Sequence, residues 1–185
     1  MDKLQEAINA IDAALNQQEV DIKFLNYKPD IQDEETRKRI FFLLMDAYNT
    51  KMPFNKLIGI EVIELDLDKA VTLINARDEL YGNYVQKILH GGVISSVIDL
   101  AGGIIAQAHA FSKMKDITIG ELLVKFSFMS TLNIRVDYLR PGAGDKFKCI
   151  SRVVRAGNKV AVTQTEFLNM ENRQIAIGTG SYLIG

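Results

Sequence analysis

The 185-residue sequence has little of what builds metal sites and disulfides: one cysteine, Cys149, and two histidines. A single cysteine cannot form an internal disulfide, which fits a reducing compartment. So few sulfur and imidazole ligands argue against a dedicated metal site. We expect neither a metal nor another cofactor. The first residues lack a basic start followed by an apolar run, so we predict no signal peptide and a cytoplasmic location.

An excess of charge of either sign is also missing. The chain has 22 Lys and Arg against 23 Asp and Glu, a net charge of −1. This balance gives no electrostatic reason to expect nucleic acid or an anionic membrane as a partner. Helices predicted within residues 1–50 carry a local excess of acidic residues, the wrong sign for DNA. Length and a hydrophobic content of 48% fit one domain with a sizeable core.

One long apolar segment organises the chain. Residues 89–106 read as a helix that is apolar almost all round, interrupted by Asp99 and followed by Gln107. We predict a buried core helix rather than a membrane span. Each glycine inside a helix costs about 1 kcal/mol relative to alanine, so its glycines indicate a tightly wrapped neighbour.

Two features of this helix point to chemistry. Asp99 is a carboxylate in an apolar setting, which is costly unless it has a partner, so it is a functional candidate. The alternative is a structural buried acid. His90, Gly91 and Gly92 stand where the helix begins. Free N–H groups and the positive end of a helix suit an oxyanion, and Gly91 has no Cβ to obstruct its own N–H.

Before the core helix, the patterns predict a helix over residues 3–16 and a second helix capped by Asp33 and ended by Pro53. Strand character begins near Leu57, with a turn at residues 66–69. Residues 76–89 look irregular, with Gly82 and Asn83 as a turn signal.

After the core helix, Thr118 and Glu121 fit a capping box and predict a short helix near residues 119–128. The apolar period then becomes two, which predicts a half-buried strand over 132–138 and further strands over 147–155, 160–168 and 174–183. A meander of long antiparallel strands must bury one face, and the core helix can cover it. We predict an α+β fold with the sheet wrapped around one central helix. Gly178, on a small-residue face of the last strand, is expected to meet that helix.

His90-Gly91-Gly92 followed by Asp99 resembles the signature of hotdog-fold acyl-CoA thioesterases, in the phenylacetyl-CoA thioesterase-like (PaaI-like) branch. Residues 132–141, 154–159 and 178–182 add to the resemblance, which covers about residues 54–185. It implies an N-terminal helical arm over residues 1–52 and a hotdog domain over 53–185. The segment between Ala110 and Thr131 is longer than the family pattern.

The resemblance implies hydrolysis of an acyl-CoA thioester to a carboxylic acid and free CoA. The Gly91 N–H would stabilise the oxyanion, and Asp99 would act as nucleophile or as general base on water. His90 would shape the turn or contribute to the site directly, and Thr131 would help to position water. The candidate substrate-binding residues are Asn83, Gln86, Gly92, Arg155 and Lys159. For Arg155 and Lys159 there are two interpretations: they contact the CoA phosphates, or they are solvent-exposed charges of a hairpin with no role in binding.

Gly91 and Asp99 are eight residues apart, about 12 Å along a helix axis. A thioester needs both groups within about 3 Å of its reacting atoms, which one helix cannot readily provide. Another element or a second subunit must therefore supply one of them. The resemblance implies a second subunit, in a homodimer or a dimer of dimers. A non-catalytic acyl-CoA-binding or regulatory hotdog protein is the alternative, and a hydratase is disfavoured because no His–carboxylate dyad is evident.

Overall fold

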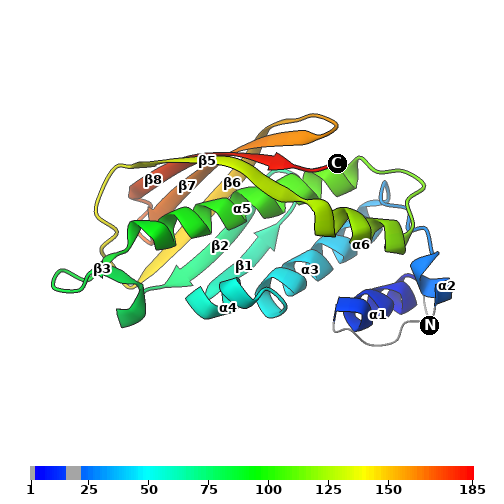
Figure 1. Cartoon of the computed structure of the whole chain (residues 1–185), viewed down its shortest axis with the longest axis horizontal. Helices are drawn as coiled ribbons and strands as arrows, with labels where there is room; N and C mark the ends of the chain where they lie inside the picture. Colours follow the sequence, from blue (N-terminus) through cyan, green and yellow to red (C-terminus); the bar gives the residue numbers. More distant parts are fainter. Residues whose placement is uncertain (1–2, 16–21) are drawn as a thin grey trace.

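The computed structural model describes residues 3–15 and 22–185, and its centre is one antiparallel sheet (Figure 1). Six strands lie in the order β1-β2-β6-β7-β8-β5. Their bounds are Ile60–Leu65 for β1, Ala70–Asn75 for β2, Ser130–Tyr138 for β5, Lys146–Ala156 for β6, Val160–Asn169 for β7 and Gln174–Leu183 for β8. The predicted meander is confirmed for β6, β7 and β8, but its first strand, β5, pairs with β8 and not with β6.

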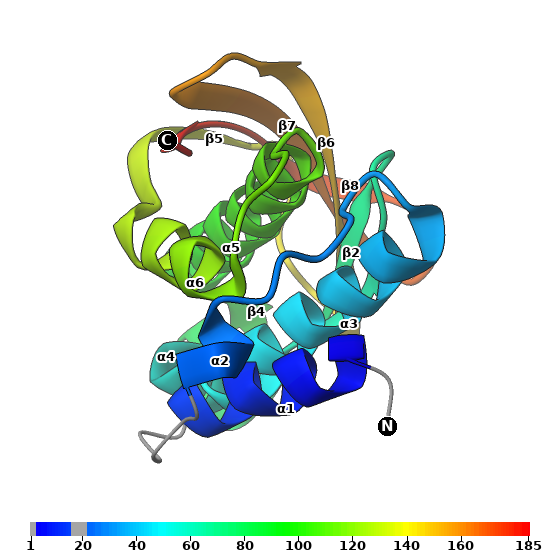
Figure 2. The same cartoon turned by 90° about the vertical axis from the view of Figure 1, so that its right-hand side faces the viewer.

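Helix α5, Gly91–Ser112, lies in the concave face of this sheet (Figures 1 and 2). Most of its apolar residues are buried, including Val97, Ala101 and Ile104 at 0% exposure. Among the described residues, α5 is the one helix long and apolar enough to cross a membrane. This helix packs against the strands β2, β5, β6, β7 and β8. The predicted core helix is therefore confirmed.

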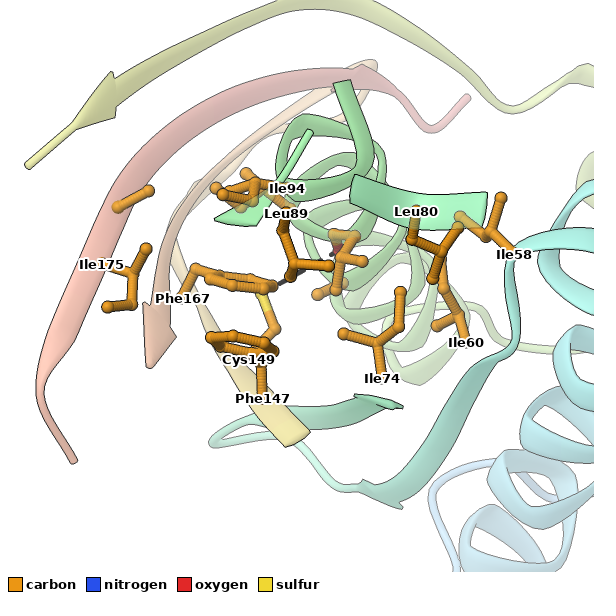
Figure 3. Close-up of a cluster of buried hydrophobic side chains, with 14 residues drawn as sticks. Ile58, Ile60, Ile74, Leu80, Leu89, Ile94, Phe147, Cys149, Phe167 and Ile175 are labelled. Carbon is orange, nitrogen blue, oxygen red and sulfur yellow. Dashed lines mark hydrogen bonds between the residues drawn. The ribbon is translucent and has the colours of Figure 1, made fainter. Parts of the chain in front are cut away.

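The core under the N-terminal half of α5 is built from aromatic and branched side chains (Figure 3). Phe147 and Phe167, from neighbouring strands β6 and β7, stack with ring centroids 5.4 Å apart. Both rings are fully buried beside Cys149. Burial raises the pKa of the Cys149 thiol, so this cysteine is an inert packing residue.

Two glycines mark the close approach of helix and sheet that the sequence predicted. A Cβ on Gly102 would collide with the Tyr182 ring and with the Thr163 hydroxyl. A Cβ on Gly178 would collide with Ile98 of the helix. Small residues are therefore required on both sides of this contact.

The N-terminal helices pack against the same core. Helix α1, Lys3–Leu15, confirms the predicted first helix, and α2, Ile22–Leu25, is a short further turn. Helix α3, Glu34–Thr50, is capped by Asp33, which accepts a hydrogen bond from the Thr36 N–H at 2.8 Å. Its Leu44 belongs to one cluster with Ile104 and Ile105 of α5. Residues before 52 therefore contribute to the central core.

Helix α6, Ile119–Phe128, begins with the predicted capping box between Thr118 and Glu121. It follows α5 and leads into β5 (Figure 1). Its Ile119 is fully buried against Ala7 and Ile11 of α1. The segment that departs from the family pattern is thus a helix docked on the N-terminal helices.

Three predictions before the core helix were wrong. Pro53 does not end α3 but is the first residue of α4, Pro53–Ile58, where a missing N–H costs nothing. Leu57 therefore lies in a helix, and the strand starts after Gly59, whose φ of +76° ends α4. Residues 76–89 are also more ordered than expected: a 3₁₀ turn, Asp78–Leu80, precedes a hairpin of β3, Tyr81–Asn83, and β4, Ile88–Leu89.

The turn in that hairpin spans residues 84–87 rather than Gly82 and Asn83. Asn83 initiates it, because its side-chain oxygen accepts the Gln86 N–H at 3.0 Å.

Strand β5 is confirmed, but its predicted half-burial holds only for its middle residues. Ile134 and Val136 pack on the core, whereas Leu132 and Tyr138 are 54% and 52% exposed. The reason is its position, because β5 forms one edge of the sheet and has a neighbour on one side only, β8. The edge strand therefore presents apolar side chains to solvent.

Candidate active site

The start of α5 is held by a local network around His90. His90 Nδ1 accepts the Gly92 N–H at 2.9 Å, so the imidazole is the N-cap of the helix. The His90 N–H donates to the Leu80 carbonyl at 2.8 Å. This geometry gives His90 the turn-shaping role that the sequence left open beside a direct one.

Gly91 is the first residue of α5 and is partly exposed. Its carbonyl accepts the Tyr138 hydroxyl at 2.8 Å, and the Tyr138 ring lies where a Cβ would make van der Waals contact. Within the described part of the chain, the Gly91 N–H has no acceptor. It is therefore available to a ligand, as a first-turn N–H is expected to be.

Asp99 lies two turns further along α5, and its carboxylate is partnered. The Thr131 hydroxyl donates to Asp99 Oδ1 at 2.9 Å. The Tyr182 hydroxyl donates to the Asp99 main-chain carbonyl at 3.0 Å. Thr131 and Tyr182 are directly opposed in the β5–β8 pairing, so the register of one edge strand delivers both groups to one point of the helix.

The surroundings of Asp99 perturb its acidity. Partial burial raises the pKa of the Asp99 carboxyl, and the hydroxyls of Thr131 and Tyr182 oppose that rise. Burial, and then the charge of Asp99, raise the pKa values of Tyr48 and Tyr182, so both phenols stay neutral donors. The pKa of Asp99 is therefore held above the ordinary carboxyl value, a perturbation that is common at functional sites.

A pocket opens beside the Asp99 carboxylate. Its walls come from α3, α4, α5 and β5, and consist of Tyr48, Met52, Phe54, Asn55, Ser96, Asp99, Leu100, Gly103 and Thr131. Asn55 is buried and donates to the Tyr48 carbonyl at 3.0 Å, which ties α4 to α3. The acid therefore faces a pocket lined by both polar and apolar side chains, a mixture that suits a small-molecule site.

Four residues that lie beside Asp99 or Gly91 had not been predicted as site residues: Tyr48, Ser96, Tyr138 and Tyr182. Ser96 could have been found, because it lies one turn before Asp99 on the same helix. Tyr48, Tyr138 and Tyr182 carry no local signal, because each arrives from an element distant in sequence.

The other predicted site residues lie elsewhere in the chain. Asn83 and Gln86 bond to each other in the exposed β3–β4 turn. Arg155 and Lys159 are exposed on the β6–β7 hairpin, which Lys113 ties to the C-terminal end of α5 through a 2.7 Å hydrogen bond to the Ala156 carbonyl. None of these four residues, nor His90, Gly91 and Gly92, is in the wall of the Asp99 pocket. Among the predicted residues, only Asp99 and Thr131 lie in the wall of this pocket.

Comparison with known proteins identifies the family of this arrangement. The family model described as "Thioesterase superfamily" matches residues 86–176, which include all of α5 and the strands β5, β6 and β7. The medium/long-chain acyl-CoA thioesterase YigI of Escherichia coli K12 is 37% identical over 150 residues, 81% of this chain and 97% of that protein.

Solved structures agree with the sequence comparison. A Shewanella oneidensis protein related to the thioesterase superfamily superposes with a TM-score of 0.76 at 39% identity, covering 85% of this chain and 100% of that chain. The Escherichia coli PaaI protein, at 21% identity, superposes with a TM-score of 0.64 over 80% of this chain and 94% of its own, which shows the fold alone. The resemblance inferred from the sequence is confirmed: the chain belongs to the thioesterase superfamily and has its hotdog fold.

Proposed function

We propose that this thioesterase hydrolyses acyl-CoA thioesters at Asp99, giving a carboxylic acid and free CoA. The observation that carries the proposal is the Thr131–Asp99 hydrogen bond at the wall of a pocket, on the helix whose first N–H is available. A purely structural buried acid would not need an adjoining chamber. The acyl-CoA substrate is that of the relative YigI.

In the proposed reaction, Asp99 takes a proton from a water molecule that the Thr131 hydroxyl helps to hold. The water oxygen bonds to the thioester carbon, the carbonyl oxygen becomes an oxyanion, and the C–S bond then breaks. The CoA thiolate leaves and takes up a proton. Direct attack by the Asp99 carboxylate, through a mixed anhydride that water then hydrolyses, gives the same products. No step requires a metal or a cofactor.

The oxyanion must be stabilised by a donor that the same helix cannot supply, because Gly91 lies about 12 Å along the axis from Asp99. We assign this role to Gly91 of a second copy of the chain, in a homodimer with two equivalent sites. The exposed apolar side chains of edge strand β5, Leu132 and Tyr138, support an interface there. A dimer of dimers is compatible with the same contact.

In such a dimer the β3–β4 turn and the β6–β7 hairpin act on the neighbouring site. Asn83 and Gln86 would contact the acyl carbonyl, Gly92 would border it, and Arg155 and Lys159 would meet the CoA phosphates. We retain the division into a helical arm, residues 1–52, and a hotdog domain, residues 53–185, and a cytoplasmic location as proposals.

A thiol-reporting assay with acyl-CoAs of graded length and aryl-acyl-CoAs tests the function. Free CoA is expected from at least one of them without added metal, and EDTA should not inhibit its release. If CoA esters bind but no thiol appears across the series, the chain is an acyl-CoA-binding protein instead.

A further inference from the structure

The wall of the Asp99 pocket contains a glycine, Gly103, that helix–sheet packing does not require. It lies one turn beyond Asp99 on the same face of α5. A Cβ there would make ordinary contacts, 3.6 Å to the Tyr182 ring and 4.0 Å to the Tyr48 hydroxyl. A glycine inside a helix is destabilising relative to alanine, and alanine fits at 103. The space that this glycine leaves open therefore calls for another reason.

A second, smaller pocket, which we call the side pocket, adjoins the Asp99 pocket at that space. Tyr48, Gly103 and Thr131 line both pockets, so the two meet along these residues. The remaining walls of the side pocket come from α5, the start of β5 and the end of β8, which lie side by side (Figure 1): Gln107, Met129, Ser130, Tyr182, Leu183 and Ile184. Because Ser130 is exposed, the side pocket opens to the surface there.

The walls of the side pocket are rich in hydrogen-bonding groups. They include the hydroxyls of Tyr48, Ser130, Thr131 and Tyr182 and the amide of Gln107. The Tyr48 hydroxyl donates to Gln107 Oε1 at 2.8 Å in a buried hydrogen bond, which fixes the orientation of the amide. Among residues 3–15 and 22–185, the Gln107 amide nitrogen has no acceptor. Its N–H groups can therefore donate to a ligand in the side pocket.

The volume of the side pocket, about 80 Å³, decides what it can hold. Pockets for drug-sized ligands have volumes of roughly 300 to 1,000 Å³, so the side pocket is too small for a second organic substrate. A water molecule needs roughly 10 to 15 Å³ and about two to four polar partners. The side pocket provides both, so the ligand that fits it is a small group of water molecules.

Hydrolysis requires water at Asp99 while the substrate is bound. In the proposed reaction the thioester occupies the Asp99 pocket and displaces water from it. The side pocket reaches the same acid from the other side of Gly103. Thr131, whose hydroxyl donates to Asp99 Oδ1 at 2.9 Å, lines both pockets. A water molecule that passes Gly103 therefore arrives beside the hydroxyl that holds it and the carboxylate that deprotonates it.

We propose that the side pocket holds and delivers the water molecule that each hydrolysis consumes, with Gly103 as the passage to Asp99 and the Gln107 amide as a donor to the stored water. The inference rests on the proposed function and adds a second binding site to it, for water rather than for acyl-CoA. It also gives a reason why alanine, the better helix former, is absent at 103.

The test compares turnover with ligand binding in variants of the side pocket. Gly103→Ala closes the passage, Gln107→Met removes the amide at similar size, and Ser130→Phe fills the mouth. Each should lower kcat for octanoyl-CoA at least about 10-fold, because the nucleophile is no longer positioned. The Kd of octyl-CoA thioether, which cannot be hydrolysed, should stay at the wild-type value by calorimetry. The acidic limb of the pH–rate profile should not move, because the Thr131–Asp99 hydrogen bond is untouched.

Ser127→Phe is the matched control, because Ser127 is also an exposed serine but lines neither pocket. It should keep the kcat and Kd of the wild type. Wild-type kcat in all three side-pocket variants would overturn the water supply and leave the thioesterase function intact. A loss of thioether binding that accounts for the fall in activity would also overturn it, because the side pocket would then hold substrate. A wild type that releases no thiol from any acyl-CoA would overturn the proposed function itself.

A crystal structure of the complex with octyl-CoA thioether tests the side pocket without relying on turnover or on the folding of a variant. Ordered water bonded to the Gln107 amide is expected in the side pocket while the thioether fills the Asp99 pocket. An alkyl chain in the side pocket, or a side pocket without ordered water, would overturn the proposal.

Discussion

The Thr131 hydroxyl donates a 2.9 Å hydrogen bond to the Asp99 carboxylate across 32 residues of sequence. The intervening chain completes α5, forms α6 and returns as edge strand β5. Pairing of β5 with β8 then sets Thr131 opposite Tyr182, which holds the Asp99 main chain. One strand register therefore fixes both the side chain and the backbone of the proposed catalytic acid, and the following predictions test this arrangement.

Asp99→Asn should lower kcat by at least about 100-fold, the contribution of a positioned base or nucleophile. The substitution is nearly isosteric, so the fold should persist. In the wild type, kcat/KM should fall on the acidic side with an apparent pKa above the ordinary carboxyl value of 3.8, because burial raises the pKa of Asp99. A pH–rate profile checks both points, and near-wild-type turnover by the variant would remove Asp99 from the reaction.

The same variant should be more stable than the wild type at neutral pH. Because the pKa of Asp99 is raised on folding, the folded state binds its proton more tightly than the unfolded state does. As pH rises from the ordinary pKa to the raised one, ionisation of Asp99 lowers the free energy of unfolding. Above the raised pKa this loss of stability no longer changes with pH. Thermal unfolding should show a higher Tm for Asp99→Asn at about pH 7 and no difference near the ordinary pKa. Lower stability of the variant at neutral pH would contradict this.

Thr131→Val removes the hydroxyl while keeping the shape of the side chain. The lost hydrogen bond to a charged group is worth enough to reduce kcat roughly 10-fold. Since that bond lowers the pKa of Asp99, its loss should move the acidic limb of the pH–rate profile to higher pH. Thr131→Ser, which restores a hydroxyl, is the matched control and should recover most of both effects. A limb that does not move in Thr131→Val would show that the bond is absent in the working enzyme.

Adjacent glycines of α5 should respond in opposite ways to alanine. Gly102→Ala forces a collision with Tyr182 and Thr163, and Gly178→Ala one with Ile98, so each should destabilise by about 1 to 3 kcal/mol. Gly103→Ala meets only ordinary contacts and should be neutral or stabilising by up to about 1 kcal/mol. Chemical denaturation measures all three. Equal effects at 102 and 103 would contradict the one-sided contact between helix and sheet.

Mixing two inactive variants tests the site shared between subunits. In Asp99→Ala the acid is lost, and in Gly91→Pro the oxyanion N–H is lost at a helix position that tolerates proline. After joint unfolding and refolding, half of the dimers should be mixed, and each has one site with both defects and one intact site. Activity should return to roughly a quarter of the wild-type value.

Each variant refolded alone is the control and should stay inactive. If mass spectrometry confirms mixed dimers but no activity returns, both groups serve one site from one chain and the dimer proposal is wrong.

Much of the fold was predictable because its signals are local. The capping box at Thr118, the N-cap at Asp33 and the period-two pattern of the late strands depend on residues close in sequence. The apolar run through α5 predicted a wrapped helix because such a surface has to be buried. Leu57 was misplaced in a strand because a short helix between Pro53 and Gly59 carries too few residues to show its period.

The sequence by itself determined the central helix, the acid at 99 and the glycine at its N-terminus, since each depends on neighbours within a few turns. Only the tertiary structure decided which hydroxyl meets Asp99, that β5 lies at an edge with Leu132 exposed, and that Gly102 rather than Gly103 touches the sheet. These are matters of strand order and register. Strand order and register depend on how segments distant in the chain pack on the same apolar surface, and a local sequence pattern does not contain that information.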